Sequence, residues 1–287
     1  MADAQVRPDF IREDLPTGFG VVEQPLGFRE RLFALGWVRK GLLLVAMALV
    51  WEGYARWLGN SLLFPTFVET VAAFVGSLRS AELIGATLRS VEMLLKGYAL
   101  GLALAAVATA FATATQVGAD LLDTLTSMFN PLPSIALLPL AMVWFGLGDG
   151  SIIFVLIHAV LWSVALNTHA GFRSVSPTWR MVGQNYGLSR IAYVTRILIP
   201  GALPSILTGL KIGWAFAWRT LIAAELVFGV SSSGGGLGWF IFQNKNLLDI
   251  PNVFAGLLMV IVFGLLVDNF VFRALEQRTV RRWGMQS

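Results

Sequence analysis

Residues 176–200 read SPTWRMVGQNYGLSRIAYVTRILIP and separate two long apolar segments, 150–171 and 205–230. Each apolar segment has the roughly 20 residues that a helix needs to cross a bilayer. A polar stretch with helix caps between two such segments predicts a helical connection that projects from a membrane.

Capping and breaking residues divide this connection into two short helices. Ser176 can cap the first helix, and Pro177 suits its first position. Gly187 is placed to end that helix in the left-handed conformation, after which Ser189 can cap a second helix and Pro200 can end it. The pattern predicts a helix-turn-helix.

The composition of the whole chain is that of a membrane protein. Of the 287 residues, 56% are hydrophobic and 13% are charged, whereas soluble domains carry about 25% charged residues. The sequence therefore predicts an all-α integral membrane protein with about six transmembrane helices. A stretch at 62–89 is expected to form one or two short helices at the outer surface. The expected spans are 39–58, 91–115, 121–146, 150–171, 205–230 and 252–275.

Basic residues mark the cytoplasmic side of this topology. They gather before the first span, in the loop 172–200 and after the last span, and basic flanks are retained in the cytoplasm. Both termini are therefore expected there, and the net charge of +4 gives no reason to expect nucleic acid. The expected regions are a polar, disordered tail 1–38, a transmembrane domain 39–276 and a tail 277–287.

The third span contains a break. Asn130, Pro131 and Pro133 lie in its interior, and the prolines remove amide donors, so carbonyls need partners from protein or water. This break is expected to face protein or a pathway. Glycine pairs elsewhere are spaced to let a neighbouring helix approach closely. They are Gly97 with Gly101 and Gly209 with Gly213.

The loop 172–200 resembles the coupling loop of permeases in binding-protein-dependent ABC importers. Their pattern is Glu-Ala-Ala, three residues, Gly, nine residues, Ile, one residue and Leu-Pro. Gly187, Ile197 and Pro200 fall on this pattern in register, and Ile199 stands where leucine is usual.

The loop departs from the family pattern at its acidic position. Met181, Val182 and Gly183 stand where the pattern has Glu-Ala-Ala, so the residue expected to pair with the ATPase is missing. The resemblance then implies docking through Trp179, Val182 and Tyr186 and through the shape of the loop.

The resemblance covers roughly residues 60–285. Segments 131–148, 201–211, 218–225 and 234–238 are similar to permeases of the nitrate, sulfonate and taurine type. The resemblance implies a type I ABC importer permease fold and a homodimer among the lipids of a bacterial inner membrane. It also implies an extracytoplasmic solute-binding protein and two subunits that bind ATP and Mg. No cofactor and no catalytic site are expected in this chain.

A charged residue inside a span indicates that its side chain is buried in protein or faces a pathway. Inserting such a side chain at the bilayer centre costs about 2.5 kcal/mol or more of free energy. Arg219 lies deepest in the fifth span, where a guanidinium would offer forked donors to an oxyanion; a structural ion pair is the alternative. Lys211 is expected to snorkel, and Asp268 is expected to pair with a basic group such as Arg273 or to accept hydrogen bonds in the bundle. The expected pathway residues are Arg219, Glu225, Trp218, Asn130 and Pro131.

Other chemistries lack the residues they need. The chain has no cysteine, and His158 and His169 lie about 16 Å apart along one helix, so no metal site is expected. The glycines within 234–238 are expected to form an extracytoplasmic turn, because they lack the Lys-Ser/Thr of a phosphate-binding loop. No nucleophile, base and metal converge as an intramembrane enzyme would require.

These observations predict the permease subunit of an ATP-driven importer, with a small and preferably anionic solute. Nitrate, sulfonates, taurine and carboxylates remain open as substrates. The alternative is a self-contained secondary transporter, which would carry acidic relays and inverted repeats. The sequence shows no repeat and few acidic groups within its spans.

Overall fold

The structure, a computed structural model, describes residues 35–228 and 235–281, which are helical and contain no strand. The expected tail 1–38 thus lies almost wholly outside the described residues, as do residues 282–287. The longer helices are α2 (Gly36–Leu58), α3 (Phe67–Arg79), α4 (Glu82–Ala114), α5 (Gln116–Phe129), α6 (Leu138–Phe145), α7 (Asp149–Ser174), α8 (Pro177–Asn185), α11 (Leu203–Phe228), α12 (Leu237–Asn246) and α13 (Ile250–Leu266). The short helical segments are η1 (Ser134–Leu137), α9 (Arg190–Tyr193), η2 (Val194–Leu198), α10 (Ile199–Gly201), η3 (Val267–Phe272), α14 (Arg273–Glu276) and η4 (Gln277–Arg281).

The chain divides into two units, Met1–Val50 and Trp51–Ser287. The described part of the first unit is the beginning of α2, whose side chains are mostly exposed and apolar. The second unit contains the rest of the helices and the core.

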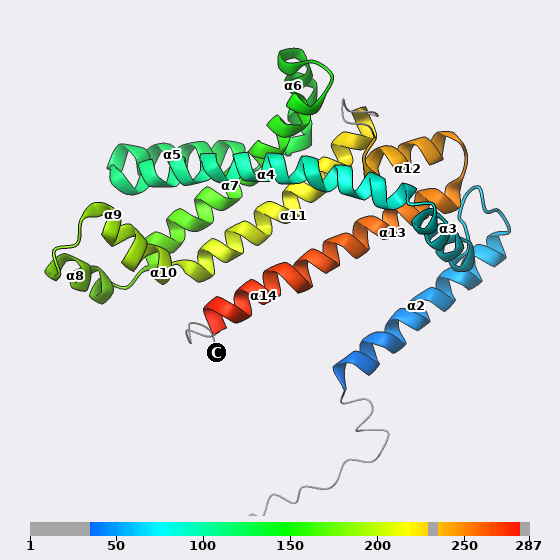
Figure 1. Ribbon diagram of the computed structural model, residues 1–287, viewed down its shortest axis with the longest axis horizontal. Helices are drawn as coiled ribbons and strands as arrows, with labels where there is room; N and C mark the ends of the chain where they lie inside the picture. The colour runs from blue at the N-terminus through cyan, green and yellow to red at the C-terminus, as the bar shows by residue number, and fades with distance from the viewer. Residues whose placement is uncertain (1–34, 229–234, 282–287) are drawn as a thin grey trace, which may run out of the picture. The chain divides into compact units, whose positions relative to one another are not determined.

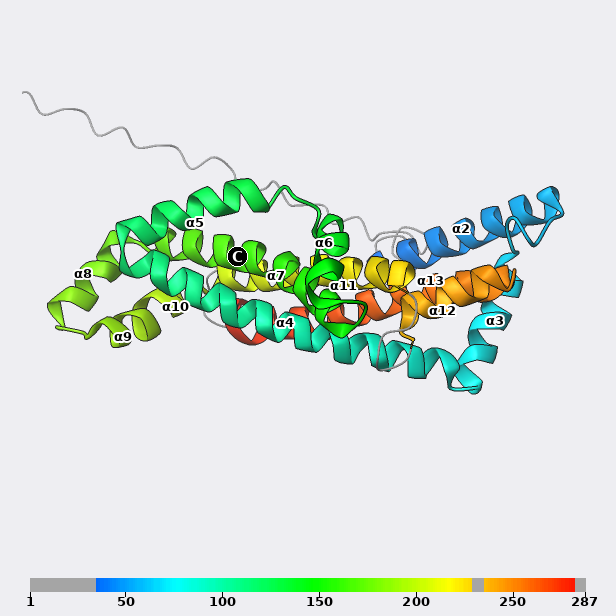
Figure 2. The same cartoon turned by 90° about the horizontal axis from the view of Figure 1, so that it is seen from above.

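The core of the second unit is built on α7, which lies between α4 and α11 (Figures 1 and 2). Leu94, Leu156 and Leu221 are fully buried there. A Cβ atom on Gly97 would lie 2.6 Å from the Cβ of Leu156, and one on Gly101 would lie 2.7 Å from the Cβ of Val160. These glycines permit the backbones of α4 and α7 to approach, which confirms the sequence prediction for this pair.

The second glycine pair acts on the other side of α7. A Cβ atom on Gly209 would lie 2.8 Å from the Cβ of Asn167, and one on Gly213 would lie 3.1 Å from a methyl group of Val164. Both glycines therefore let α11 approach α7, as predicted. The central three-helix layer depends on small residues on both outer helices.

The number and limits of the spans differ in part from the sequence prediction. Within residues 35–228 and 235–281, four helices are long and apolar enough to cross a membrane, and the count rises to six if two bent helix pairs each form one span. The second span begins at Glu82 rather than near residue 91. Residues 82–89 therefore belong to a 33-residue helix, and only α3 forms the separate short helix expected within 62–89.

The predicted break in the third span is a sharp bend. The axes of α5 and of the η1–α6 segment differ by 88°, and the chain turns between them beside α7 and α11 (Figure 1). Asn130 ends α5, and the prolines that follow cannot donate the hydrogen bonds that would continue it. The second bend, of 75°, separates the segment 190–201 from α11.

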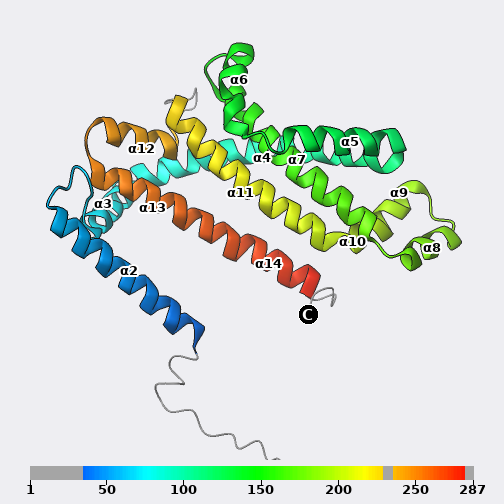
Figure 3. The same cartoon turned by 180° about the vertical axis from the view of Figure 1, so that it is seen from behind.

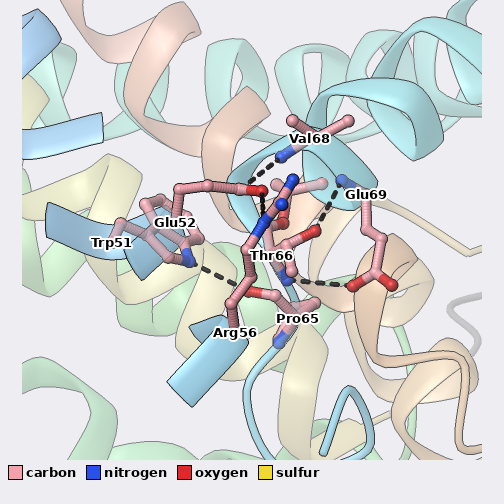
Figure 4. Close-up of polar contacts among 8 residues, drawn as sticks. Trp51, Glu52, Arg56, Pro65, Thr66, Val68 and Glu69 are labelled. Carbon is pink, nitrogen blue, oxygen red and sulfur yellow. Dashed lines mark hydrogen bonds and ion pairs between the residues drawn. The ribbon is translucent and has the colours of Figure 1, made fainter. Parts of the chain in front are cut away.

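Within the second unit, the end of α2 is tied to the start of α3 (Figure 4). The Glu52 carboxylate accepts from Arg56 Nε at 2.7 Å and from the backbone N–H of Val68 at 3.2 Å. Thr66 and Glu69 form a capping box at the start of α3. A carboxylate at a helix N-terminus also meets the positive end of the helix dipole, so this contact fixes the turn between the two helices.

The second unit has two distinct ends. Its α3 and α12 lie at one end and α8 to α10 at the other (Figures 1 and 2). From the α12 end, α13 and its continuation run beside α11 (Figures 1 and 3), and the Trp218 ring on α11 packs against Phe263 at 4.8 Å between centroids. The segment α8 to α10 and the α3–α12 region are therefore connected through the same central helices.

Gly97→Ala and Gly85→Ala test the close approach of α4 and α7. Alanine at Gly97 would collide with Leu156, whereas nothing lies within 4 Å of a Cβ on Gly85 in the same helix. We expect Gly97→Ala to destabilise the protein by about 1–3 kcal/mol through overpacking. Gly85→Ala should be neutral or stabilising, because alanine favours helix. Thermal unfolding of the purified protein measures both, and equal midpoints would contradict the packing described.

Candidate functional site

The helix-turn-helix predicted from the sequence is present, as α8 followed by the segment 190–201. The Ser176 hydroxyl caps α8, and Pro177 occupies its first turn. Gly187 has φ +60°, and the N–H groups of Gly187 and Leu188 donate to the carbonyls of Gln184 and Gly183. This is a Schellman motif, in which glycine is favoured because it enters the left-handed region without strain. The second helix extends one residue past Pro200, to Gly201.

This helix-turn-helix, called the hairpin below, consists of α8 and the segment 190–201. It exposes large apolar side chains. Trp179 is 60% exposed, Met181 is 54% exposed and Tyr186 is 80% exposed. Val182, Ile197 and Pro200 are half-buried. Exposed aromatic rings beyond the end of a bundle are typical of surfaces that bind another protein.

The buried face of the hairpin explains one departure from the family pattern. Gly183 is buried, and a Cβ atom there would lie 2.7 Å from the ring of Tyr193. A small residue is therefore needed where α8 crosses the returning helix. Met181, at the position of the missing glutamate, points to the exposed side and cannot form an ion pair.

Arg180 fixes the hairpin to the bundle. Its guanidinium donates to the carbonyl of Phe172 at 2.6 Å and to that of Val175 at 3.1 Å, at the C-terminal end of α7, where carbonyls lack helical partners. Beneath it, Phe172 and Val175 pack with Leu198 and Ala202 in a small separate core. From the sequence, Arg180 was only one of the basic residues of the loop 172–200 that indicate the cytoplasmic side, and its contact with the end of α7 was not predicted.

A cavity of about 350 Å³ lies at the bend between α5 and α6. The bend, α7 and α11 form its walls. Asn130, Pro131 and Arg219, three of the five expected pathway residues, line it. Arg219 is exposed in this chain and lies over the Phe216 ring at 5.6 Å. Within residues 35–228 and 235–281, Arg219 forms no ion pair.

Aromatic and imidazole side chains that the sequence analysis did not assign to the pathway also line this cavity. The rings of Phe129 and Trp162 stack at 5.4 Å with an interplanar angle of 11°. His158 meets both rings edge-on, and its Nδ1 lies 3.0 Å from the Ser134 hydroxyl. These residues come from segments 129–134 and 158–162, which lie apart in the sequence and meet where the end of α5 and η1 pack against α7.

The other two expected pathway residues lie away from this cavity. Trp218 is buried, and its Nε1 donates to the carbonyl of Val260 at 3.3 Å. Glu225 is 5% exposed and accepts from the Ser90 hydroxyl at 2.7 Å and from the backbone N–H of Gly238 at 2.8 Å. A role in the pathway for Trp218 or Glu225 stays a prediction.

The Glu225 contacts fix the start of α12. Leu237 N–H donates to Ser90 Oγ at 2.8 Å, and a Cβ atom on Gly236 would lie 2.1 Å from a Glu225 carboxylate oxygen. The residues just before α12 are thereby held between α4 and α11. Part of the expected glycine turn, including Gly234, lies outside the described residues.

The expectation that Asp268 pairs with a basic group is confirmed, but its partner is Lys211 on α11 rather than Arg273. The Lys211 Nζ lies 2.8 Å from the Asp268 carboxylate, so the pair joins α11 to η3. Snorkelling of Lys211 stays a prediction. Among the described residues, no group of three or more His, Cys, Asp or Glu could hold a metal ion.

The family model described as binding-protein-dependent transport system inner membrane component matches residues 97–281. The chain belongs to this family. The match includes the hairpin and the cavity at the α5–α6 bend. This is the type I permease fold, all-helical over the described residues.

Three relatives illustrate the similarity of this permease to other proteins. A putative ABC transporter permease protein of Methanocaldococcus jannaschii is 31% identical over 232 residues, 79% of this chain and 85% of the relative. The putative aliphatic sulfonates transport permease protein of Bacillus subtilis is 30% identical over 249 residues, 86% and 88% of the two chains. The taurine transport system permease protein of Escherichia coli is 35% identical over 158 residues, 55% and 56% of the two chains.

Arg180→Ala and Arg196→Ala test the attachment of the hairpin. Removing the guanidinium of Arg180 leaves the last carbonyls of α7 without their donor, and hydrogen bonds to charged groups contribute about 1.5–3 kcal/mol. We expect amide hydrogen exchange across 177–188 to accelerate by about tenfold or more. Arg196 is exposed on the same hairpin, so its replacement should leave exchange unchanged. Identical exchange in both variants would contradict the anchoring role.

Proposed function

We propose that this chain is the transmembrane permease subunit of an ATP-driven importer for a small oxyanion in the taurine, sulfonate, nitrate or carboxylate class. Membership of the binding-protein-dependent family supports this proposal, as do relatives that are named for the transport of taurine and of aliphatic sulfonates. In this account the chain works as a homodimer in the bacterial inner membrane, with both termini in the cytoplasm. Two partner subunits bind ATP and Mg, and an extracytoplasmic solute-binding protein delivers the solute.

The observation that carries the proposal is the attached hairpin. It offers Trp179 and Tyr186 to a partner, while Arg180 and the small core beneath connect it to α7 and the start of α11. A force applied to α8 is therefore transmitted to α7 and α11. When ATP draws the partner subunits together, the hairpins follow and the permease alternates between inward and outward openings.

The proposed pathway is the cavity that contains Arg219. This cation lies about 24 Å from the start of α11 and is exposed in the single chain. A charged side chain at membrane depth faces protein or water rather than lipid. Two protomers would bring two such guanidinium groups to the pathway, with Asn130 and Pro131 at the bend beside each.

Gly187→Val and Gly187→Asn test the coupling role of the hairpin. The left-handed conformation at position 187 excludes a β-branched side chain but is tolerated by asparagine. In proteoliposomes with the ATPase subunits and the solute-binding protein, Gly187→Val should lower binding-protein-stimulated ATP hydrolysis and solute uptake by about tenfold or more. Gly187→Asn should retain most of both activities.

The same assay tests the alternative function. Uptake that persists without ATPase subunits, and that is equal in both Gly187 variants, would identify a secondary transporter. Loss of uptake in both variants with normal ATP hydrolysis would contradict coupling through the hairpin.

A further inference from the structure

We propose that the cavity at the α5–α6 bend is a binding site for an organic oxyanion, a carboxylate or sulfonate carried on a small apolar or aromatic body. This inference rests on the proposed function, because the proposed ligand is the transported solute, bound within the pathway. It assigns the negative group to Arg219 and the carbon body to the wall formed by Phe129, His158 and Trp162.

The charge of the ligand follows from Arg219. Its guanidinium lies at the cavity over Phe216 and has no acidic partner among the described residues. The two other charged residues of α11 are already satisfied, Lys211 by Asp268 and Glu225 by Ser90. Arg219 is thus the cationic residue of α11 that is available to bind an anion. The planar, forked N–H donors of its guanidinium match the oxygens of a carboxylate or sulfonate.

The carbon body of the ligand follows from the aromatic part of the cavity lining. Phe129 and Trp162 present a stacked aromatic pair with His158 against its edge. Ile135, Ala159 and Ala223 continue an apolar lining. A small inorganic anion such as nitrate would contact Arg219 but leave this wall unused. A ligand with a hydrocarbon or aromatic part gains contact with it.

Two unpaired nitrogens beside the cavity supply an independent indication of a polar ligand. Trp162 Nε1 and His158 Nε2 are buried, and neither has a hydrogen-bond partner within the part of the chain that the structure describes. Indole nitrogen is only a donor, and His158 Nε2 is a donor when Nδ1 accepts from Ser134. Buried donors are normally paired, so both are suited to oxygens of a bound anion. The Phe129 ring packs on both side chains, so their exposure to a ligand requires Phe129 to move.

The position of Phe129 makes that movement possible within the fold. It is the last residue of α5, immediately before the 88° bend. A change in the bend would shift its ring relative to α7. Ligand entry would therefore be coupled to the geometry of residues 130–133.

Binding of four probe anions tests this inference. The permease–ATPase complex in nanodiscs, without nucleotide or solute-binding protein, is titrated calorimetrically with benzoate, benzenesulfonate, propanesulfonate and nitrate. We expect at least one organic anion to bind tenfold or more tightly than nitrate. The ratio of benzoate to benzenesulfonate affinity distinguishes a carboxylate site from a sulfonate site, and that of benzenesulfonate to propanesulfonate tests the aromatic body.

Matched variants identify the groups that bind. Arg219→Gln should weaken all organic anions by tenfold or more, whereas Trp162→Leu should weaken the aromatic anions most. Trp162→Phe keeps the ring but removes its donor, so it should have a smaller effect. Trp144 is exposed on α6 and does not line the cavity, and Trp144→Phe should bind as the native protein does.

The outcomes separate this inference from the proposed function. Nitrate binding as tightly as every organic anion, or organic binding unchanged in both Arg219→Gln and Trp162→Leu, would overturn the inference. Absence of binding by any probe, with ATP-coupled uptake intact, would overturn it and leave the importer function standing. Binding as predicted, with uptake independent of the ATPase subunits, would overturn the importer function instead.

Discussion

Backbone polar groups in a bilayer must find partners within the protein, and this constraint explains where the chain breaks its helices. A straight helix satisfies its own N–H and C=O groups, so α4 and α7 can span the membrane against lipid and each other. The segment 130–133 cannot, because its prolines lack donors. The structure places this bend against α7 and α11, around a cavity. The break therefore creates the space that we assign to the solute, and close glycine contacts hold α7, which lines this space, against α4 and α11.

Charged side chains inside a membrane also need partners from protein or water. The three charged residues of α11 meet this need in different ways. Lys211 pairs with Asp268 on η3. Glu225 is buried and accepts hydrogen bonds from Ser90 and Gly238, which fix the start of α12. Arg219 lies at the cavity over an aromatic ring and without an acidic partner in the described part of the chain. Lys211 has an ion-pair partner within the protomer and Glu225 has hydrogen-bond donors. Arg219 therefore marks the face of α11 that we assign to the pathway.

Local patterns predicted the parts of the structure that local chemistry determines. Ser176 and Gly187 identified the ends of α8, and the run beginning at Asn130 identified the bend. The start of α4 was not predicted, because Glu82 and Arg89 gave residues 82–89 the appearance of a surface helix; Arg89 in fact donates to the carbonyl of Gly235. Pairs such as Ser90 with Glu225 join residues 135 positions apart, and no periodicity encodes them. The aromatic wall was missed for the same reason, since Phe129 meets Trp162 through the packing of α5 against α7, two helices that are not adjacent in the sequence.

The most direct test of this account is the access of water to the cavity at the bend. The chain contains no cysteine, so single cysteines can be introduced at Thr220, which lines the cavity, and at Val107, an exposed apolar residue of α4. Each variant, in the assembled complex in proteoliposomes, is treated with a charged, membrane-impermeant thiol reagent. We predict that Thr220→Cys reacts, that an excess of bound organic anion protects it, and that Val107→Cys does not react. A Thr220→Cys variant that is inert to the charged reagent but reacts with a lipid-soluble one would show that the bend faces lipid, and would contradict the pathway.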